Sequence, residues 1–247
     1  MMKRIKQVIL KLLDRMLNKK NFKIVPFYQY EGQLEIVKYD WIKKLNIETI
    51  IDVGASYGQY STKARSLFTN STIFAFEPLP ESFEKLKKSF SKDAKFFPFQ
   101  IAMSNLVGEV NFFKNQHVGA SSLLEMTNLH KVAHPYSKNY DKIIVKSNTL
   151  DNFFKNRKLE NNILLKLDVQ GAESSVLEGA TDLLKKVRLI YSEISFNELY
   201  EGQMFITEII YYLKNFGFRF VGIEDVSQRL KDGVFLQGNA FFIKDEE

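Results

Sequence analysis

The sequence predicts a doubly wound α/β domain on a mostly parallel, seven-stranded sheet, with a final antiparallel strand and an N-terminal helical appendage. Three observations support this prediction. From Glu48 onward, short apolar runs alternate with amphipathic ones, and strands that alternate with helices form a parallel sheet covered on both faces. The last two apolar runs, 218–224 and 239–245, follow each other without a helix, which indicates an antiparallel pair. Hydrophobic residues at 45% and charged residues at 26% of the 247 positions are typical of a globular protein.

The expected elements follow one another in the order that such a sheet requires. The first part of the domain holds a strand over 48–54, a helix over 57–68, a strand over 71–78, a helix over 80–90 with Pro80 in its first turn, and a strand over 95–104. A hairpin or irregular region over 108–148 comes next. The rest holds a helix over 149–156 capped by Thr149 or Asp151, a strand over 161–171, a helix over 172–186, a strand over 188–195, a helix over 206–217, and the two closing strands.

Basic charge is concentrated at the N-terminus. Residues 1–23 hold eight Lys or Arg and one Asp, whereas the rest of the chain is close to neutral, so a nucleic-acid groove across the core is disfavoured. Apolar residues in this segment recur at helical spacing, which predicts a basic amphipathic helix over 1–25 ahead of the main domain, 26–247. Its apolar runs are too short for a transmembrane span. Three alternatives remain open: peripheral membrane contact through residues 1–23, packing on its own domain, or packing on a second copy in a homodimer.

The absence of Cys excludes a thiolate metal site and a Cys nucleophile, and fits a reducing interior. We therefore expect a cytoplasmic protein, at the inner membrane face if the helix binds lipid.

A glycine-containing turn follows the first strand and is the main candidate for cofactor binding. It begins after Asp52 and contains Gly54, Ala55, Ser56, Tyr57 and Gly58. Ligands of open parallel sheets bind beyond the carboxyl ends of the strands, and glycines let the backbone turn and approach them. The spacing differs from the dinucleotide pattern G-x-G-x-x-G, and Asp52 would repel a pyrophosphate but attract an ammonium group.

Glu77 ends the second strand, where a carboxylate suits the two hydroxyls of a ribose. A ribose, little or no phosphate and an amino-acid end are the features of S-adenosylmethionine, which we expect as the cofactor. The alternative is that Asp52 and Glu77 only cap helices.

Six segments resemble the FkbM-type methyltransferases, a family of S-adenosylmethionine-dependent enzymes best known for O-methylation. They are "IDVGASYGQYS", "FAFEP", "IAMSNLVGEVNFF", "ASSLL", "SNTLDNFF" and "LLKLDVQGAESSVLEGA", within residues 48–243. The resemblance implies a Rossmann-like sheet of the class I methyltransferase type. It also implies that Asp52, Gly54, Gly58 and Glu77 bind the cofactor, with Pro78 beside Glu77, and that the turn from Ala102 to Ser104 lies near the adenine. The chain departs from the family pattern at Ser56, where Asn is frequent, and at Gln170, where Glu is frequent.

A lysine inside the most apolar strand is the main candidate for catalysis. An unpaired ammonium at Lys166 would cost several kcal/mol, so we expect it to be paired or near the open end of the strand. Strand alternation places Lys166 and Asp168 on one face, and Glu193 ends the next strand. We expect Asp168 to lie beside the cofactor and to orient or deprotonate an acceptor hydroxyl, while Lys166 holds it. The alternative is a structural ion pair, and a free Asp, with a pKa of about 3.9, is a weak base for an alcohol.

The three histidines are weaker candidates. His117 lies in the irregular region and is the best alternative base, because the ordinary pKa of His is near neutrality. His130 and His134 have the spacing of a metal pair on a helix but no acidic neighbour in register, so we expect surface residues and no metal site.

These observations predict O-methylation of a hydroxyl on a small-molecule or glycan acceptor, such as a sugar of a cell-surface glycan or a lipid-linked precursor. One alternative is a noncatalytic nucleoside-binding scaffold of the same fold. A nicotinamide-dependent oxidoreductase is less favoured, because the third glycine is missing and Asp52 is acidic.

Overall fold

A computed structural model of the chain describes residues 38–245. The chain forms two compact units, 1–45 and 46–247. The described part of the first unit contains the short helix α3 (Asp40–Lys43). The amphipathic helix expected over 1–25 lies outside the described residues. Between residues 38 and 245, no helix is both long enough and apolar enough to cross a membrane.

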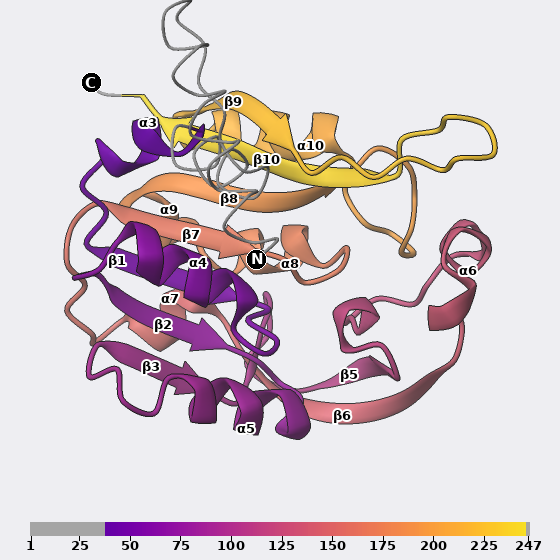
Figure 1. Ribbon diagram of the computed structural model, residues 1–247, viewed down its shortest axis with the longest axis horizontal. Coiled ribbons are helices and arrows are strands. Elements are labelled where there is room, and N and C mark those ends of the chain that lie inside the picture. Colours follow the sequence, from indigo (N-terminus) through magenta and orange to yellow (C-terminus); the bar gives the residue numbers. More distant parts are fainter. Residues whose placement is uncertain (1–37, 246–247) are drawn as a thin grey trace, which may run out of the picture. The chain divides into compact units, whose positions relative to one another are not determined.

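The second unit is built on a seven-stranded sheet with the order β3-β2-β1-β7-β8-β10-β9 (Figure 1). Its strands are β1 (Thr49–Val53), β2 (Thr72–Phe76), β3 (Phe96–Phe99), β7 (Ile163–Leu167), β8 (Val187–Ser195), β9 (Phe218–Glu224) and β10 (Gln237–Lys244). Strand β10 is antiparallel to β8 and β9, and the other pairs are parallel. The predicted fold class is therefore confirmed. Every residue of β1 and β7 is buried, so the core is centred on this pair.

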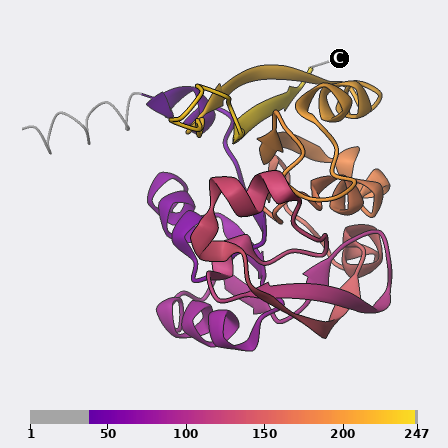
Figure 2. The same cartoon turned by 90° about the vertical axis from the view of Figure 1, so that its right-hand side faces the viewer.

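Helices cover both faces of the sheet. Helices α4 (Gln59–Leu67) and α5 (Pro80–Ser89) lie on one face, and α7 (Leu150–Phe154), α8 (Glu173–Glu178), α9 (Thr181–Leu184) and α10 (Ile206–Lys214) lie on the other (Figure 2). Thr149 caps α7 by accepting a hydrogen bond from Asn152 N at 3.0 Å. Asp151, the other candidate cap, instead accepts bonds from backbone N–H groups of α9, at 2.9 Å from Asp182 and 2.8 Å from Leu183.

Two expected elements are each divided in the structure. The helix expected over 172–186 is interrupted after α8 at Gly179, where a Cβ would lie 2.2 Å from the Ser104 carbonyl oxygen. The strand expected over 95–104 ends at Phe99, and its last part forms β4 (Ala102–Met103) in a second sheet. Both interruptions come from contacts between segments distant in sequence.

The second sheet has three strands in the order β4-β6-β5, in which β5 (Gly108–Asn115) and β6 (Tyr140–Asn148) form an antiparallel pair. The segment between them contains η1 (Val118–Ala120), α6 (Asn128–Ala133) and η2 (Pro135–Ser137). Figures 1 and 2 show this segment beyond the carboxyl ends of β1 and β7. The irregular region predicted over 108–148 thus faces the sheet edge at which ligands of such folds bind.

Candidate active site

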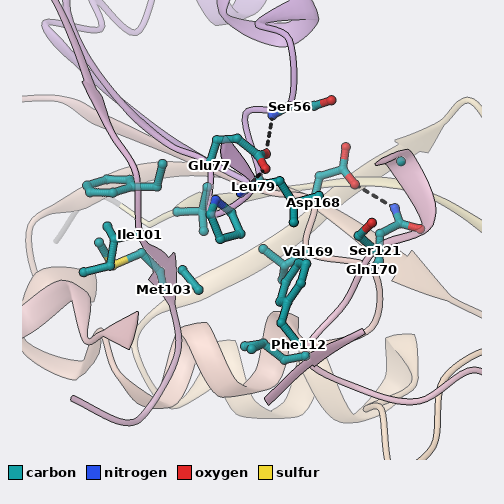
Figure 3. Close-up of a pocket in the computed structure, with 17 residues that line it drawn as sticks. Ser56, Glu77, Leu79, Ile101, Met103, Phe112, Ser121, Asp168, Val169 and Gln170 are labelled. Carbon is teal, nitrogen blue, oxygen red and sulfur yellow. Dashed lines mark hydrogen bonds between the residues drawn. The ribbon is translucent and has the colours of Figure 1, made fainter. Parts of the chain in front are cut away.

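Two adjoining cavities lie at this edge and share Gly54, Ser56, Gly119, Asp168 and Gln170 among their lining residues. The narrow cavity, of about 80 Å³, is shown in Figure 3. Its walls are largely apolar and include Ile101, Met103, Phe112 and Val169. The wide cavity, of about 660 Å³, has a volume typical of small-molecule sites. A flat apolar group and a polar group could therefore bind side by side along the edge.

The turn after β1 needs glycine because it packs directly against the end of β7. Gly54 has a φ of +76°, and a Cβ there would lie 1.9 Å from the Asp168 carbonyl oxygen. Gly58 has a φ of +88°, and its Cβ would meet Phe90 and Leu86 at 2.7 and 2.8 Å. Gly54 therefore shapes the cavity wall, whereas Gly58 allows α4 and α5 to pack closely. Both Ala55 and Tyr57 line the wide cavity, and Ser56 lines both cavities.

Glu77 stands at the mouth of the narrow cavity and is only 4% exposed. Its two carboxylate oxygens accept hydrogen bonds from the backbone N–H groups of Ser56 and Leu79, each at 2.9 Å (Figure 3). Burial raises the pKa of Glu77 to about 7, although these two bonds act in the opposite direction. Each oxygen keeps a further lone pair, so the carboxylate can still accept bonds from a pair of hydroxyls.

The other residues expected near the adenine lie close by. Pro78 and Ala102 line the narrow cavity. Ser104 is 2% exposed, lines neither cavity and has its hydroxyl 2.7 Å from that of Ser147.

A buried ion pair joins the two central strands, and one of its members, Lys166, lines the wide cavity. Asp52 and Lys166 face each other in register across β1 and β7, and the Lys166 ammonium lies 3.0 Å from Asp52 Oδ1. The Asp52 side chain is 0% exposed, accepts a 2.6 Å bond from the Ser61 hydroxyl and lines neither cavity. The structure thus places the carboxylate assigned to the cofactor's ammonium against a lysine ammonium instead.

Lys166 is held entirely by the chain. Its ammonium donates to the Gly54 carbonyl at 2.8 Å and lies 3.6 Å from Asp168 Oδ2. Burial on its own would lower the pKa of Lys166, but the negative charges of Asp52 and Asp168 outweigh it and leave that pKa raised. The lysine therefore stays charged and links the turn to the catalytic candidates.

Asp168 and Glu193 come together at the wall of the wide cavity, as expected, and Gln170 joins them. Its Nε2 donates to Asp168 Oδ1 at 2.9 Å and to Glu193 Oε2 at 2.8 Å. Glu193 also accepts a 2.6 Å bond from Gln237 Nε2 on β10. Burial, followed by the charge of Asp168, raises the pKa of Glu193 well above its ordinary value.

The histidines surround the wide cavity from the segment between β5 and β6. His117 is exposed, and its ring makes an edge contact with Tyr136 at 4.8 Å. The surface location expected for His130 is wrong: it is 3% exposed, and burial lowers its pKa to about 4. It packs against Tyr200, with ring centres 4.9 Å apart, and half-buried His134 lies beside it.

Sequence reasoning did not find Gln237 and Tyr200. Gln237 reaches the site because β10 inserts beside β8, and Tyr200 donates from its hydroxyl to Gln170 Oε1 at 3.1 Å. Neither residue belongs to a recognisable local motif; the strand order could have indicated Gln237, whereas Tyr200 lies in the connection between β8 and α10, outside the named strands.

The chain resembles several known proteins. The family model "Methyltransferase FkbM domain" matches residues 52–220. The 2-O-methyltransferase NoeI of Sinorhizobium fredii is 29% identical over 173 residues, which cover 68% of this chain and 71% of NoeI. The hexuronic acid methyltransferase AglP of Haloferax volcanii is 26% identical over 164 residues, which cover 66% of this chain and 62% of AglP. A putative S-adenosylmethionine-dependent methyltransferase from Listeria monocytogenes has a TM-score of 0.46 at 9% identity, covering 84% of this chain and 98% of that one.

Proposed function

The chain belongs to the FkbM methyltransferase family, whose methyl donor is S-adenosylmethionine, and we propose that it methylates a hydroxyl group on a sugar of a glycan or of a lipid-linked precursor. Two relatives support this acceptor class by their names, a 2-O-methyltransferase and a hexuronic acid methyltransferase. The observation that carries the proposal is the pair of carboxyl groups, Asp168 and Glu193, on the wall of the wide cavity. Two adjacent acceptors are suited to receive a hydroxyl group.

The residues at the edge fit the cofactor. The buried Glu77 carboxylate has lone pairs for the ribose hydroxyls, and the apolar narrow cavity beside it suits the adenine. Asp168 opens into both cavities and provides a negative charge for the amino-acid end. When bound, S-adenosylmethionine supplies a methyl group already activated by the positive sulfur.

The chain's contribution is therefore mainly one of positioning. Gly54 brings the turn against the end of β7, and Lys166 fixes the turn to Asp168. Aligning an acceptor oxygen with an activated carbon can supply a large part of the rate enhancement. No observation favours the noncatalytic scaffold, and membership of the methyltransferase family argues against the nicotinamide-dependent oxidoreductase.

The proposal is tested with the purified full chain in two measurements. Calorimetric titration of S-adenosylhomocysteine should show micromolar binding that is lost or much weakened in Glu77→Ala. Transfer of labelled methyl from S-adenosylmethionine is then measured on a panel of neutral and uronic-acid oligosaccharides, with the products analysed by mass spectrometry. Methylation of a sugar hydroxyl supports the proposal. Cofactor binding without methylation of any saccharide, together with methylation of a non-sugar acceptor, contradicts it.

A further inference from the structure

We propose that Glu193, and not Asp168, accepts the proton released by the acceptor hydroxyl, and that Gln170 is the positioning residue that holds both carboxyl groups at the cavity wall. This inference rests on the proposed function, because it requires a hydroxyl acceptor. It assigns distinct roles to two carboxyl groups that the sequence could only group together.

The orientation of the Gln170 amide is fixed from both ends. Ionised carboxyl groups only accept hydrogen bonds, so the amide nitrogen is the atom that points to Asp168 and Glu193, and Oε1 is left to accept from the Tyr200 hydroxyl at 3.1 Å. The two amide hydrogens are then used by Asp168 and Glu193, at 2.9 and 2.8 Å. The backbone is fixed as well, because Ser122 donates to the Gln170 carbonyl at 2.7 Å. Gln170 therefore has no side-chain donor left for a ligand and acts by holding its neighbours.

The amide also explains how two acids can lie so close together. A glutamate at position 170, which is frequent in the family pattern, would place a third carboxyl group between Asp168 and Glu193. The neutral amide instead donates a hydrogen bond to each, and hydrogen bonds to a carboxylate favour its charged form. Gln170 thus allows a pair of acids to persist without a third negative charge.

The two carboxyl groups have different surroundings. The Asp168 side chain is 41% exposed and lies 3.6 Å from the Lys166 ammonium. Glu193 is half-buried, and its bonds in the described part of the chain are to amides, Gln170 and Gln237, with no ion pair. The nearby ammonium keeps Asp168 negatively charged, and its exposure leaves it accessible, so Asp168 is suited to accept a hydrogen bond from a hydroxyl group.

The charged groups that face Glu193 come from two elements, β7 with the turn that follows it, and α8. Asp168 at the end of β7 and Glu173 on α8 are negative neighbours, and Lys166 within β7 is the positive one. Burial is the largest influence, and together with the two acids it raises the pKa of Glu193 in spite of Lys166. A carboxyl group that binds protons more tightly is the stronger base, and a pair of acids with unequal surroundings is the usual sign of divided roles.

The proposed step balances as follows. The acceptor oxygen forms a bond to the methyl carbon as the carbon–sulfur bond breaks, and the electron pair of that bond stays on sulfur. The hydroxyl proton passes to a carboxylate oxygen of Glu193 and later leaves to water. The products are the methyl ether and S-adenosylhomocysteine, and no oxidant is required.

The first test uses the full chain and the saccharide that it methylates. Glu193→Gln should lower kcat by about 10²–10⁴-fold, the usual contribution of a general base, and should remove the acid limb of the pH profile. Its S-adenosylhomocysteine affinity should stay within about two-fold of the wild type. Asp168→Asn should raise the KM of both the acceptor and the cofactor, because Asp168 lines both cavities, and should keep the acid limb. An acid limb that survives in Glu193→Gln, or that disappears only in Asp168→Asn, overturns the assignment.

The second test needs no acceptor. Carboxyl ¹³C NMR of the full chain with S-adenosylhomocysteine should show Glu193 titrating well above the ordinary pH range of a glutamate carboxyl group. Gln170→Met should raise the Glu193 midpoint further, because a donor to the charged form is lost. Gln116→Met, at an exposed residue that lines the same cavity, is the control and should leave the midpoint unchanged.

A Glu193 midpoint within the ordinary range of a glutamate carboxyl group refutes the inference. Failure of the wild type to methylate any saccharide counts against the hydroxyl acceptor instead, so the two failures are distinguishable.

Discussion

Replacing Lys166 with Met should destabilise the protein far more than the same replacement at the surface. Met keeps the length of the buried stem but removes the ammonium that neutralises Asp52. The Asp52 carboxylate is 0% exposed and would keep only its bond from the Ser61 hydroxyl. Breaking a buried ion pair on one side leaves an uncompensated charge, which costs about 3–5 kcal/mol.

That cost is large compared with a typical stability of about 5–15 kcal/mol for a folded protein. Part of it should be recovered in the double variant Asp52→Asn/Lys166→Met, in which no charge is stranded and Asn can still accept from Ser61. The coupling energy of the double-mutant cycle should therefore be substantial, about 2–3 kcal/mol, because the two residues are in direct contact. Lys185→Met is the matched control, since Lys185 and Asp182 pair at 2.7 Å with exposed side chains (68% and 77%).

Equilibrium unfolding in urea, followed by circular dichroism, measures these changes. With a slope near 3 kcal/mol/M, Lys166→Met should shift the unfolding midpoint by about 1 M or more, whereas Lys185→Met should leave it almost unchanged. If Lys166→Met and Lys185→Met unfold at the same urea concentration, the Asp52–Lys166 pair does not stabilise the protein as proposed. If the double variant is as unstable as Lys166→Met, the stranded charge is not the cause.

Three further predictions concern the glycine turn and the titrating groups. Because the pKa of Glu77 is raised to about 7, S-adenosylhomocysteine should bind more tightly as the pH rises through 7, and Glu77→Gln should remove this dependence in calorimetry. A raised carboxyl pKa also means that the folded state becomes less stable, by about 3 kcal/mol, as the pH rises from about 4.5 to 7. This loss of stability should be smaller in Glu77→Gln. Gly54→Ala should abolish cofactor binding or folding, because its Cβ would lie 1.9 Å from the Asp168 carbonyl, whereas Gly222→Ala on β9, with nothing within 4 Å and away from both cavities, should bind normally. His130 has a lowered pKa, about 4, so stability should fall as the pH drops from about 6.5 to 4, and thermal melts of His130→Phe should lack this loss. A pH dependence of binding or stability that persists unchanged in Glu77→Gln would contradict the predictions for Glu77. A loss of stability at low pH that persists in His130→Phe would contradict the prediction for His130.

The order of elements was predictable because it depends on local patterns. Alternating apolar and amphipathic runs predict βαβ units, and the missing helix before β10 predicts its antiparallel direction. The breaks at Gly179 and after Phe99 were not predictable, because they depend on contacts between distant segments. A glycine in an apolar helical run is compatible with a continuous helix until the position of the Ser104 carbonyl is known.

The site residues that follow from the order of the strands were predictable, and those that depend on strand register or on distant contacts were not. Glu77 and Asp168 directly follow β2 and β7, and Glu193 lies near the end of β8, so a parallel sheet brings them to one edge, and the structure places them there. The partner of Asp52 was not predictable, because its position opposite Lys166 depends on the register of β1 and β7, and a shift of one residue would reverse every side chain. Likewise, His130 is buried by a fold of the segment between β5 and β6 that leaves no periodic signal.

The register of β1 and β7 also determines the charge that the cavity presents. Lys166 is committed to Asp52 at 3.0 Å and only approaches Asp168 at 3.6 Å, so one cation serves two acids and none is left for Glu193. Amide groups take the place of a second cation there, at 2.8 Å from Gln170 and 2.6 Å from Gln237. Burial, followed by the charges of Asp168 and Glu173, raises the pKa of Glu193, and the charge of Lys166 offsets only part of that increase. The charge at the cavity wall therefore depends on which carboxyl group the buried lysine pairs with, and that choice is set by the register in which Lys166 lies opposite Asp52 on β1 and Tyr191 on β8.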